Sequence, residues 1–224
     1  MVTASTSATA RTAFAFTVTA LDATNNIATG YTGTVHFTSS DGAAGVTLPA
    51  NSMLTNGVGT FSATLRTAGS QTITATDTMT ASITGTSNTI AVSAASATHF
   101  AVSAPASATN GTAFNFTVTA LDQFNNTATS YGGTVHFTSS DGSATLPANS
   151  TLTNGTGTFS ATLRTNGNQT ITATDTTSIT GTSNTIVVTA VSAAITDAIP
   201  VEPRLAGNPA GWSGDAGAVG AAGG

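Results

Sequence analysis

The sequence contains no cysteine and no lysine, and charged residues make up 6% of its 224 positions. Without cysteine, the chain can form neither a disulfide nor a thiolate metal site. Its basic residues are four arginines, Arg11, Arg66, Arg164 and Arg204, and the formal net charge is −5. So few cations cannot form the basic patch with which proteins bind nucleic acid or anionic membranes. The missing lysine also excludes an isopeptide cross-link between asparagine and lysine.

Long apolar segments are missing as well. No run of apolar residues is long enough to span a bilayer, so we expect no membrane insertion. The opening residues MVTASTSATA have neither a basic stretch nor an apolar one, and they do not form a signal peptide. Two interpretations remain, a cytosolic protein or a piece of a longer exported protein.

What the chain does have is one segment that occurs twice. Residues 13–42 read AFAFTVTALDATNNIATGYTGTVHFTSSDG, and residues 113–142 repeat them with six differences. The differences are Ala15/Asn115, Ala23/Gln123, Thr24/Phe124, Ile27/Thr127, Gly30/Ser130 and Thr32/Gly132. Beyond this segment the two copies stay in phase across two deletions, each of two residues. Deletions in loops cost little, whereas a one-residue slip inside a strand would turn its core face outward.

The duplication predicts two modules and a tail. We place repeat 1 at residues 1–93, a linker at 94–98, repeat 2 at 99–190 and a low-complexity tail at 191–224. Met1 and Val2 align with Ala101 and Val102, so repeat 1 has no counterpart of His99 and Phe100. Its first strand is therefore truncated, and we expect the chain to begin inside a longer array or a truncated reading frame.

Apolar and polar residues alternate in both repeats, which is the period of a β-strand. The inward rows of repeat 2 are Phe114, Phe116, Val118 and Ala120; Val135 and Phe137; Phe159, Ala161 and Leu163; Ile171 and Ala173; and Ile186 and Val188. Turn pairs such as Asp141-Gly142 and Asn154-Gly155 separate them. We add a first strand at His99–Ser103 and a short one near Leu146. The predicted fold is all-β, with two tandem immunoglobulin-like β-sandwiches of roughly seven strands each and a disordered Gly/Ala-rich tail.

Several segments also carry a family resemblance. They are FTVTALD at Phe116–Asp122 running into Asn125-Asn126, Tyr131-x-Gly133-Thr134-Val135-x-Phe137, Gly157-Thr158-Phe159, and QTITATD at Gln169–Asp175. With these segments the module resembles bacterial immunoglobulin-like repeats of the invasin/intimin and filamin-like kind, over nearly all of residues 1–190. The resemblance implies a tandem segment of a secreted or cell-surface protein. One departure is Asn25 and Asn125, where the family turn has glycine; asparagine tolerates positive φ, so we expect the turn to persist.

Catalytic residues are not predicted. His36 and His136 are copies of one outward strand position in different repeats, and His99 lies outside the duplicated segment. No G-x-S-x-G or H-E-x-x-H motif is present. The serine and aspartate residues beside His136 are ordinary turn formers.

Calcium is the stronger candidate ligand. Asp22, Asn25 and Asn26, and their copies Asp122, Asn125 and Asn126, place oxygen atoms in one loop of each repeat. Calcium takes six to eight oxygen ligands, usually with several carboxylates. No loop holds more than one aspartate, so we predict turns stabilised by their own side chains and no cofactor. A site that pools loops of both repeats is the alternative for calcium.

The leading interpretation is a non-enzymatic structural or adhesive segment, extracellular or on the cell surface, that acts as a stalk, a spacer or a weak multivalent binder. Its expected partners are an unidentified protein or glycan ligand at a surface and neighbouring immunoglobulin-like repeats of a longer parent chain. The alternative is an accessory, carbohydrate-binding module of a larger secreted enzyme. Such a module needs exposed aromatic rings, for which Tyr31, Tyr131 and Phe124 are the candidates.

Overall fold

The structure, a computed structural model, describes residues 1–191, and all regular secondary structure in this range is β. The first ten strands are β1 (Val2–Ala4), β2 (Ser7–Thr9), β3 (Ala13–Thr19), β4 (Thr34–Ser39), β5 (Ser52–Met53), β6 (Val58–Thr64), β7 (Gly69–Gln71), β8 (Ile73–Asp77), β9 (Thr84–Thr86) and β10 (Ile90–Ser93). The next ten are β11 (His99–Ser103), β12 (Ser107–Thr109), β13 (Ala113–Leu121), β14 (Thr134–Ser139), β15 (Ser150–Thr151), β16 (Thr156–Thr162), β17 (Gly167–Gln169), β18 (Ile171–Asp175), β19 (Thr180–Thr182) and β20 (Ile186–Thr189). Residues 1–191 contain no helix long and apolar enough to cross a membrane. The predicted tail, apart from Val191, lies outside the described residues.

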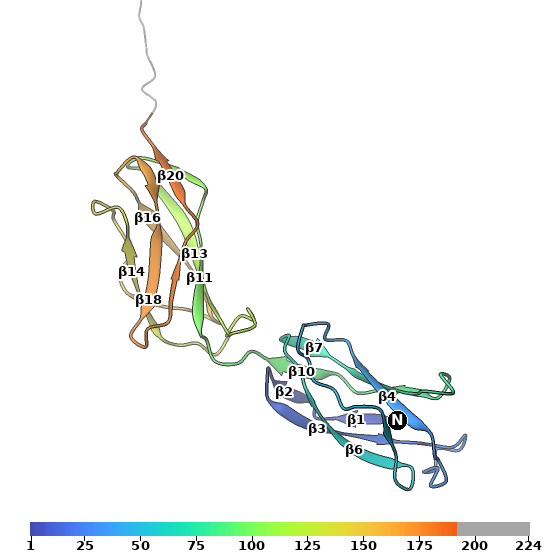
Figure 1. The fold of residues 1–224 in the computed structure, drawn as a ribbon. Helices are drawn as coiled ribbons and strands as arrows, with labels where there is room; N and C mark the ends of the chain where they lie inside the picture. The colour runs from blue at the N-terminus through green and yellow to red at the C-terminus, as the bar shows by residue number, and fades with distance from the viewer. Residues whose placement is uncertain (192–224) are drawn as a thin grey trace, which may run out of the picture. The chain divides into compact units, whose positions relative to one another are not determined.

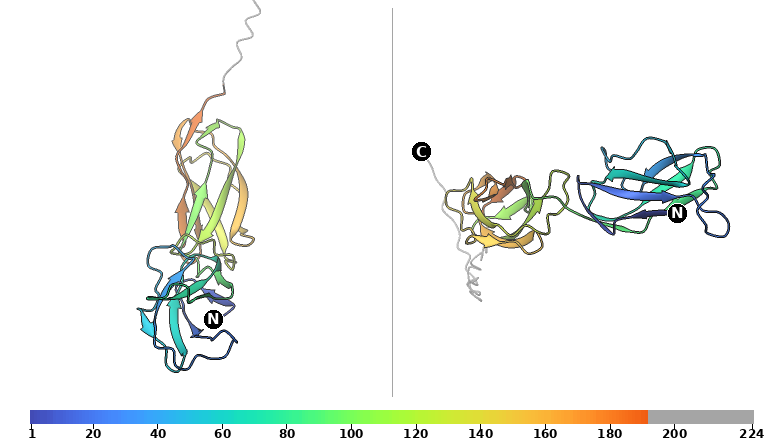
Figure 2. Two further views of the ribbon diagram at one scale, coloured as in Figure 1. Left: turned by 90° about the vertical axis from the view of Figure 1, so that its right-hand side faces the viewer. Right: turned by 90° about the horizontal axis from the view of Figure 1, so that it is seen from below.

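Each set of ten strands forms one sandwich (Figure 1). In the first sandwich, one layer has the strand order β1-β3-β6 and the other contains β5-β4-β8-β9 and β2-β10-β7. Only Thr72 separates β7 from β8, so the latter two sheets run into one another. The second sandwich repeats this order in β11–β20, and the right-hand view of Figure 2 shows its two layers close to end-on. The predicted class, two immunoglobulin-like β-sandwiches, is confirmed.

The two cores are built from equivalent residues. Phe16, Phe37 and Phe61 pack together in the first sandwich, with ring centroids 4.7–5.7 Å apart. The Phe16–Phe37 pair is edge-to-face at 5.6 Å. The aromatic trio of the second sandwich is Phe116, Phe137 and Phe159. Edge-to-face rings at this spacing stabilise a core beyond the area that they bury. The alternation seen in the sequence therefore produces the expected inward rows.

Register is conserved between the copies. Phe16 lies opposite Phe61 in the β3–β6 pair, and Phe116 lies opposite Phe159 in the β13–β16 pair. The deletions in the second copy fall outside these ladders, so every apolar side chain keeps its face.

The short strand expected near Leu146 lies elsewhere. Thr145 forms only an isolated bridge with Thr162, and the two-residue strand β15 begins at Ser150. Pro147 follows Leu146 and has no N–H group to donate to a ladder. The chain then crosses to the other layer, where β15 pairs with β14.

Strand β2 is unusual in its direction. Ser7–Thr9 run parallel to Ala91–Ser93 of β10, whereas the other strand pairs of the first sandwich are antiparallel. Strand β12 pairs with β20 in the same parallel way in the second sandwich.

Candidate functional site

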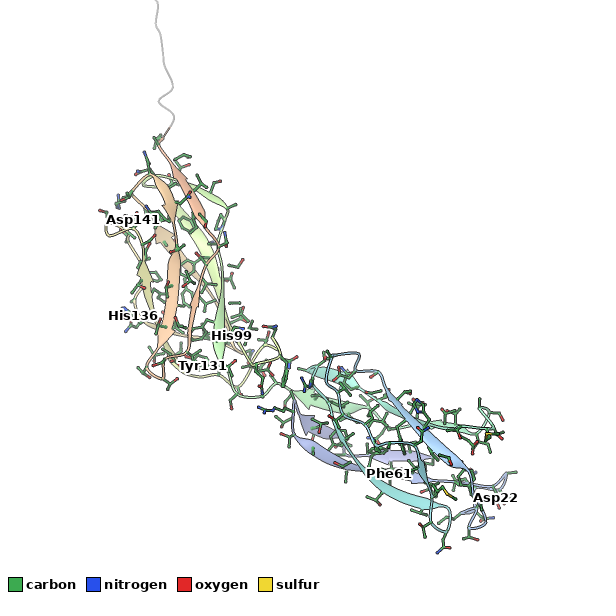
Figure 3. All side chains as sticks on the ribbon, viewed as in Figure 1. Asp22, Phe61, His99, Tyr131, His136 and Asp141 are labelled. Atoms are coloured by element: carbon green, nitrogen blue, oxygen red, sulfur yellow. The ribbon has the colours of Figure 1, made fainter. Side chains whose placement is uncertain are left out.

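The loop after β3 and its copy after β13 hold the predicted calcium candidates. Figure 3 shows Asp22 in a loop at one end of the first sandwich. Its Oδ1 accepts hydrogen bonds from the backbone N–H groups of Thr24 and Asn26, both at 2.9 Å. These backbone hydrogen bonds, led by that of Asn26, lower the pKa of Asp22. The turn persists without glycine because Asn25 takes φ 63° and Asn125 takes φ 65°.

The copy in the second sandwich is buried. Asp122 is 0% exposed, and its Oδ1 accepts hydrogen bonds from Phe124 N at 2.8 Å and Asn126 N at 3.0 Å. Its Oδ2 accepts one from Ala95 N at 3.0 Å, which joins the segment between β10 and β11 to this loop. Burial alone would raise the pKa of Asp122, but the hydrogen bonds from Asn126, Phe124 and Ala95 outweigh burial and lower it. That neither loop binds calcium by itself stays a prediction.

Asn126 binds the backbone of residues 66–68. Its Nδ2 donates to Arg66 O at 2.7 Å, and its Oδ1 accepts from Ala68 N at 2.9 Å. One amide side chain therefore satisfies a donor and an acceptor that belong to the first sandwich. Its counterpart Asn26 donates instead to Thr24 Oγ1, at 2.8 Å, within its own loop.

Phe124, one of the candidates for an exposed ring in the carbohydrate-binding alternative, is half-buried. The Arg66 guanidinium lies over the ring, with Cζ 4.9 Å from the centroid. Gly45, in the two-residue insertion of repeat 1, also lies close to the guanidinium, because a Cβ at Gly45 would lie 2.5 Å from Arg66 Cζ. In the sequence, only the difference between Phe124 and its copy Thr24 pointed to this contact. Nothing in the sequence singled out its partner, Arg66.

At the equivalent end of the second sandwich, the backbone carbonyl of Arg164 accepts a hydrogen bond from a side chain of the same sandwich. Asn110 Nδ2 donates to Arg164 O at 2.8 Å and to Asn166 Oδ1 at 2.8 Å. Arg164 corresponds to Arg66, whose carbonyl accepts from Asn126. The first sandwich has Ala10 where the second has Asn110, so it has no local side chain to occupy that carbonyl.

Two further aspartates tie the strands of each sandwich together. Asp141 is 3% exposed and accepts hydrogen bonds from Arg164 N at 2.6 Å, Thr165 N at 3.0 Å, Thr165 Oγ1 at 2.7 Å and Ser143 N at 2.9 Å. Burial raises the pKa of Asp141, but these hydrogen bonds outweigh it and bring the pKa down to about 2. Asp41 makes the equivalent set of bonds in the first sandwich.

The tyrosines also bind carboxylates. Tyr131 donates to Asp175 Oδ2 at 3.0 Å, and Tyr31 donates to Asp77. Burial, followed by the hydrogen bond to Asp77, raises the pKa of Tyr31 to about 12. Both rings are partly buried against the cores, so neither is a free aromatic platform.

Among residues 1–191, the histidines bond to asparagine and threonine side chains and not to acids. His36 Nδ1 bonds to Asn51 Oδ1 at 2.8 Å, and His136 Nδ1 bonds to Asn149 Oδ1 at 2.9 Å. His99 bonds to Thr98 Oγ1. Within residues 1–191, no three His, Asp or Glu side chains come together in a way that could hold a metal ion. The hydrogen bonds of His36 and His136 join strands β4 and β14 to the loops before β5 and β15.

No protein-family model matches the sequence, and no curated protein matches it. Solved structures similar to the chain include the D0-D1 domain of intimin, at 19% identity and a TM-score of 0.34, covering 83% of this chain and 96% of that one. The Yersinia pseudotuberculosis adhesin InvE is 21% identical with a TM-score of 0.37, covering 84% of this chain and 58% of that one. The Escherichia coli adhesin FdeC is 15% identical with a TM-score of 0.45, covering 82% of this chain and 63% of that one. Intimin and invasin-like adhesin domains are thus among the structures similar to this chain, as the sequence resemblance predicts.

Proposed function

We propose that this chain is a non-enzymatic spacer segment of a bacterial extracellular or cell-surface protein. The observation that carries the proposal is the pair of hydrogen bonds in which Asn126 donates to Arg66 O and accepts from Ala68 N. A stalk holds a distal domain in place only if its modules do not move freely against one another. These bonds couple the two sandwiches at a point where the backbone between them is built of small residues.

Three features act together at this contact. Asn126 bonds to residues 66–68, Phe124 packs under Arg66, and Asp122 holds Ala95 in the connecting segment. Cation–π contacts of a partly desolvated arginine are worth about 1–2 kcal/mol, and each added hydrogen bond about 1 kcal/mol. Contacts of this strength restrict the flexing that a short linker otherwise allows.

The experiment compares two matched variants of the whole chain. Asn126→Ala removes the hydrogen bonds to residues 66–68, whereas Asn26→Ala removes the same side chain from the loop that bonds only to itself. Amide NMR relaxation reports the rotational correlation time of each sandwich. We expect Asn126→Ala to shorten it and Asn26→Ala to leave it unchanged. Equal correlation times in both variants and the original chain would disprove the spacer mechanism.

Adhesion is the second half of the proposal. A spacer that carries repeated modules can also present weak contacts to a protein or glycan surface, and repetition raises avidity without new contacts. Neighbouring repeats of a longer parent chain would extend this effect. The accessory, carbohydrate-binding alternative lacks support from the aromatic residues, because Phe124 is packed under Arg66 and Tyr31 is bonded to Asp77.

A further inference from the structure

The tripeptide Asn-x-Ser/Thr, in which x is not proline, occurs six times in the second sandwich and not once in the first. This tripeptide is the acceptor sequence for asparagine-linked sugars. Its asparagines are Asn110, Asn115, Asn125, Asn149, Asn154 and Asn168. At each equivalent place the first sandwich lacks either the asparagine or the hydroxyl residue, and has instead Ala10, Ala15, Ile27, Met53, Val58 and Ser70.

The difference between the copies is sharpest around Asn149 and Asn154. Residues 146–165 repeat residues 48–67 with only two differences, Thr151 for Met53 and Thr156 for Val58. Both differences fall on the hydroxyl residue of an acceptor sequence. The second copy therefore completes two acceptor sequences within a segment that is otherwise identical.

Asn149 and Asn154 are also the best placed of the six asparagines. Both side chains are exposed, and neither Nδ2 atom donates a hydrogen bond within residues 1–191. The other four are less accessible to an enzyme. Asn110 Nδ2 already donates two hydrogen bonds, and the rest lie within strands β13 and β17 or in the loop that contacts the first sandwich.

At the Asn149 site, the amide and the hydroxyl lie on one face. Asn149 immediately precedes β15, in which Thr151 pairs with Thr134. Side chains two residues apart in an extended segment point to the same side, and both of these are exposed. The Oδ1 atom of Asn149 bonds to His136 Nδ1 at 2.9 Å, which leaves Nδ2 available for reaction.

The Asn154 site lies at the tip of a tight turn. Thr153 and Thr156 exchange both backbone hydrogen bonds, each at 3.0 Å. Between them φ is 50° at Asn154 and 75° at Gly155, as in a type I′ turn. The amide therefore projects from a two-residue loop, and the hydroxyl residue follows at the start of β16.

The first sandwich holds the matching asparagines in the same way. His36 Nδ1 bonds to Asn51 Oδ1 at 2.8 Å, and Asn56 also takes φ 50°. Met53 and Val58 stand where the hydroxyl residues would be, and Met53 is 62% exposed. These two loops are built-in controls, because they offer the same amides without the complete acceptor sequence.

We propose that Asn149 and Asn154 are acceptors of asparagine-linked sugars. Each Nδ2 atom forms a bond to the anomeric carbon of a sugar, and the bond from that carbon to a diphosphate leaving group breaks. The diphosphate departs with the bonding electron pair, and Nδ2 gives one proton to a base of the transferase. The co-reactants are a sugar activated as a diphosphate ester and a transferase that reads Asn-x-Ser/Thr. The second sandwich then carries sugars where the first exposes Met53.

The test is peptide mass spectrometry of the full chain, isolated from the cells that naturally make it. The peptide of residues 146–158 should carry sugar on both asparagines, and the peptide of residues 48–60 should carry none. A single sugar unit on each indicates a nucleotide-linked donor, and a preassembled oligosaccharide indicates a lipid-linked donor. Unmodified Asn149 and Asn154 would overturn the proposal, and so would sugar attached to the threonines.

Exchanging the hydroxyl residues between the copies tests the specificity in the same cells. Thr151→Met should abolish the sugar at Asn149, and Met53→Thr should add sugar at Asn51. Each variant carries the residue that the other copy has at that place, so the fold accommodates the change. Sugar that stays on Asn149 in Thr151→Met would refute the acceptor sequence. The spacer mechanism is tested by correlation times and not by mass, so either proposal can fail without the other.

Discussion

Asp141 provides a direct measure of how a single buried carboxylate holds a sandwich together. Asp141→Ala removes the acceptor of four hydrogen bonds, from Arg164 N, Ser143 N and both the N and Oγ1 atoms of Thr165. A hydrogen bond to a charged group contributes about 1.5–3 kcal/mol. Water replaces part of this loss, because Arg164 and Thr165 are exposed residues. We therefore expect the free energy of unfolding of the second sandwich to fall by about 2–4 kcal/mol.

Urea unfolding followed by hydrogen exchange and mass spectrometry separates the two sandwiches, because peptides from β14 and β18 report only on the second. The control is Asp22→Ala, since Asp22 is exposed and its hydrogen bonds stay within one loop. Asp22→Ala should lower the free energy of unfolding much less than Asp141→Ala does. A loss below about 1 kcal/mol for Asp141→Ala would refute the claim that these bonds stabilise the fold.

The pH dependence gives the same prediction a second readout. The folded-state pKa of Asp141 is about 2, below the ordinary value of 3.8, so its stabilisation is complete above the unfolded-state pKa. That stabilisation is lost as the pH falls from about 4 toward 2. The difference in stability between the original chain and Asp141→Ala should therefore be largest at neutral pH and shrink in this interval. A difference that stays constant down to pH 2 would contradict the hydrogen-bond explanation.

Three other perturbations test other parts of the molecule. Phe116 is 1% exposed, so Phe116→Ala should lower the free energy of unfolding of the second sandwich by about 3–5 kcal/mol in urea titrations. Asn154 takes φ 50°, a left-handed conformation that alanine disfavours. In the same titration, Asn154→Ala should therefore lower the free energy of unfolding by about 1 kcal/mol, and Asn154→Gly should lower it less. Millimolar calcium should raise the melting temperature little, since Asp22 and Asp122 already accept backbone hydrogen bonds. A calcium shift of many degrees, reversed by a chelator, would contradict this.

The strands could be predicted because their signal is local. Phe116 and Val118 alternate with threonines, and only one face of such a strand can enter a core. The strand expected near Leu146 was wrong because an apolar residue alone does not pair. Thr145 only bridges to Thr162 in one layer, and the next strand, β15, begins at Ser150 in the other layer.

The contacts of the candidate site could not be predicted in the same way. Asn126 and Arg66 are sixty residues apart, and no periodicity connects them. Phe124 was one of three candidate aromatic rings, and its copy Thr24 gives no hint of an arginine above the ring. Asp141 was recognised as a turn residue, but its bonds to Arg164 and Thr165 depend on the packing of a distant strand end.

The parallel pairing of β2 with β10 has a mechanical consequence. These strands lie near the start and the end of the first sandwich, so tension applied through the two ends of that sandwich pulls them in opposite directions along their shared axis. The hydrogen bonds of Ser7–Thr9 with Ala91–Ser93 are then loaded in shear and must rupture together, whereas antiparallel bonds at a free end peel apart one at a time. The β12–β20 pair gives the second sandwich the same arrangement. A pulling experiment should therefore find two rupture events of similar force, one for each sandwich.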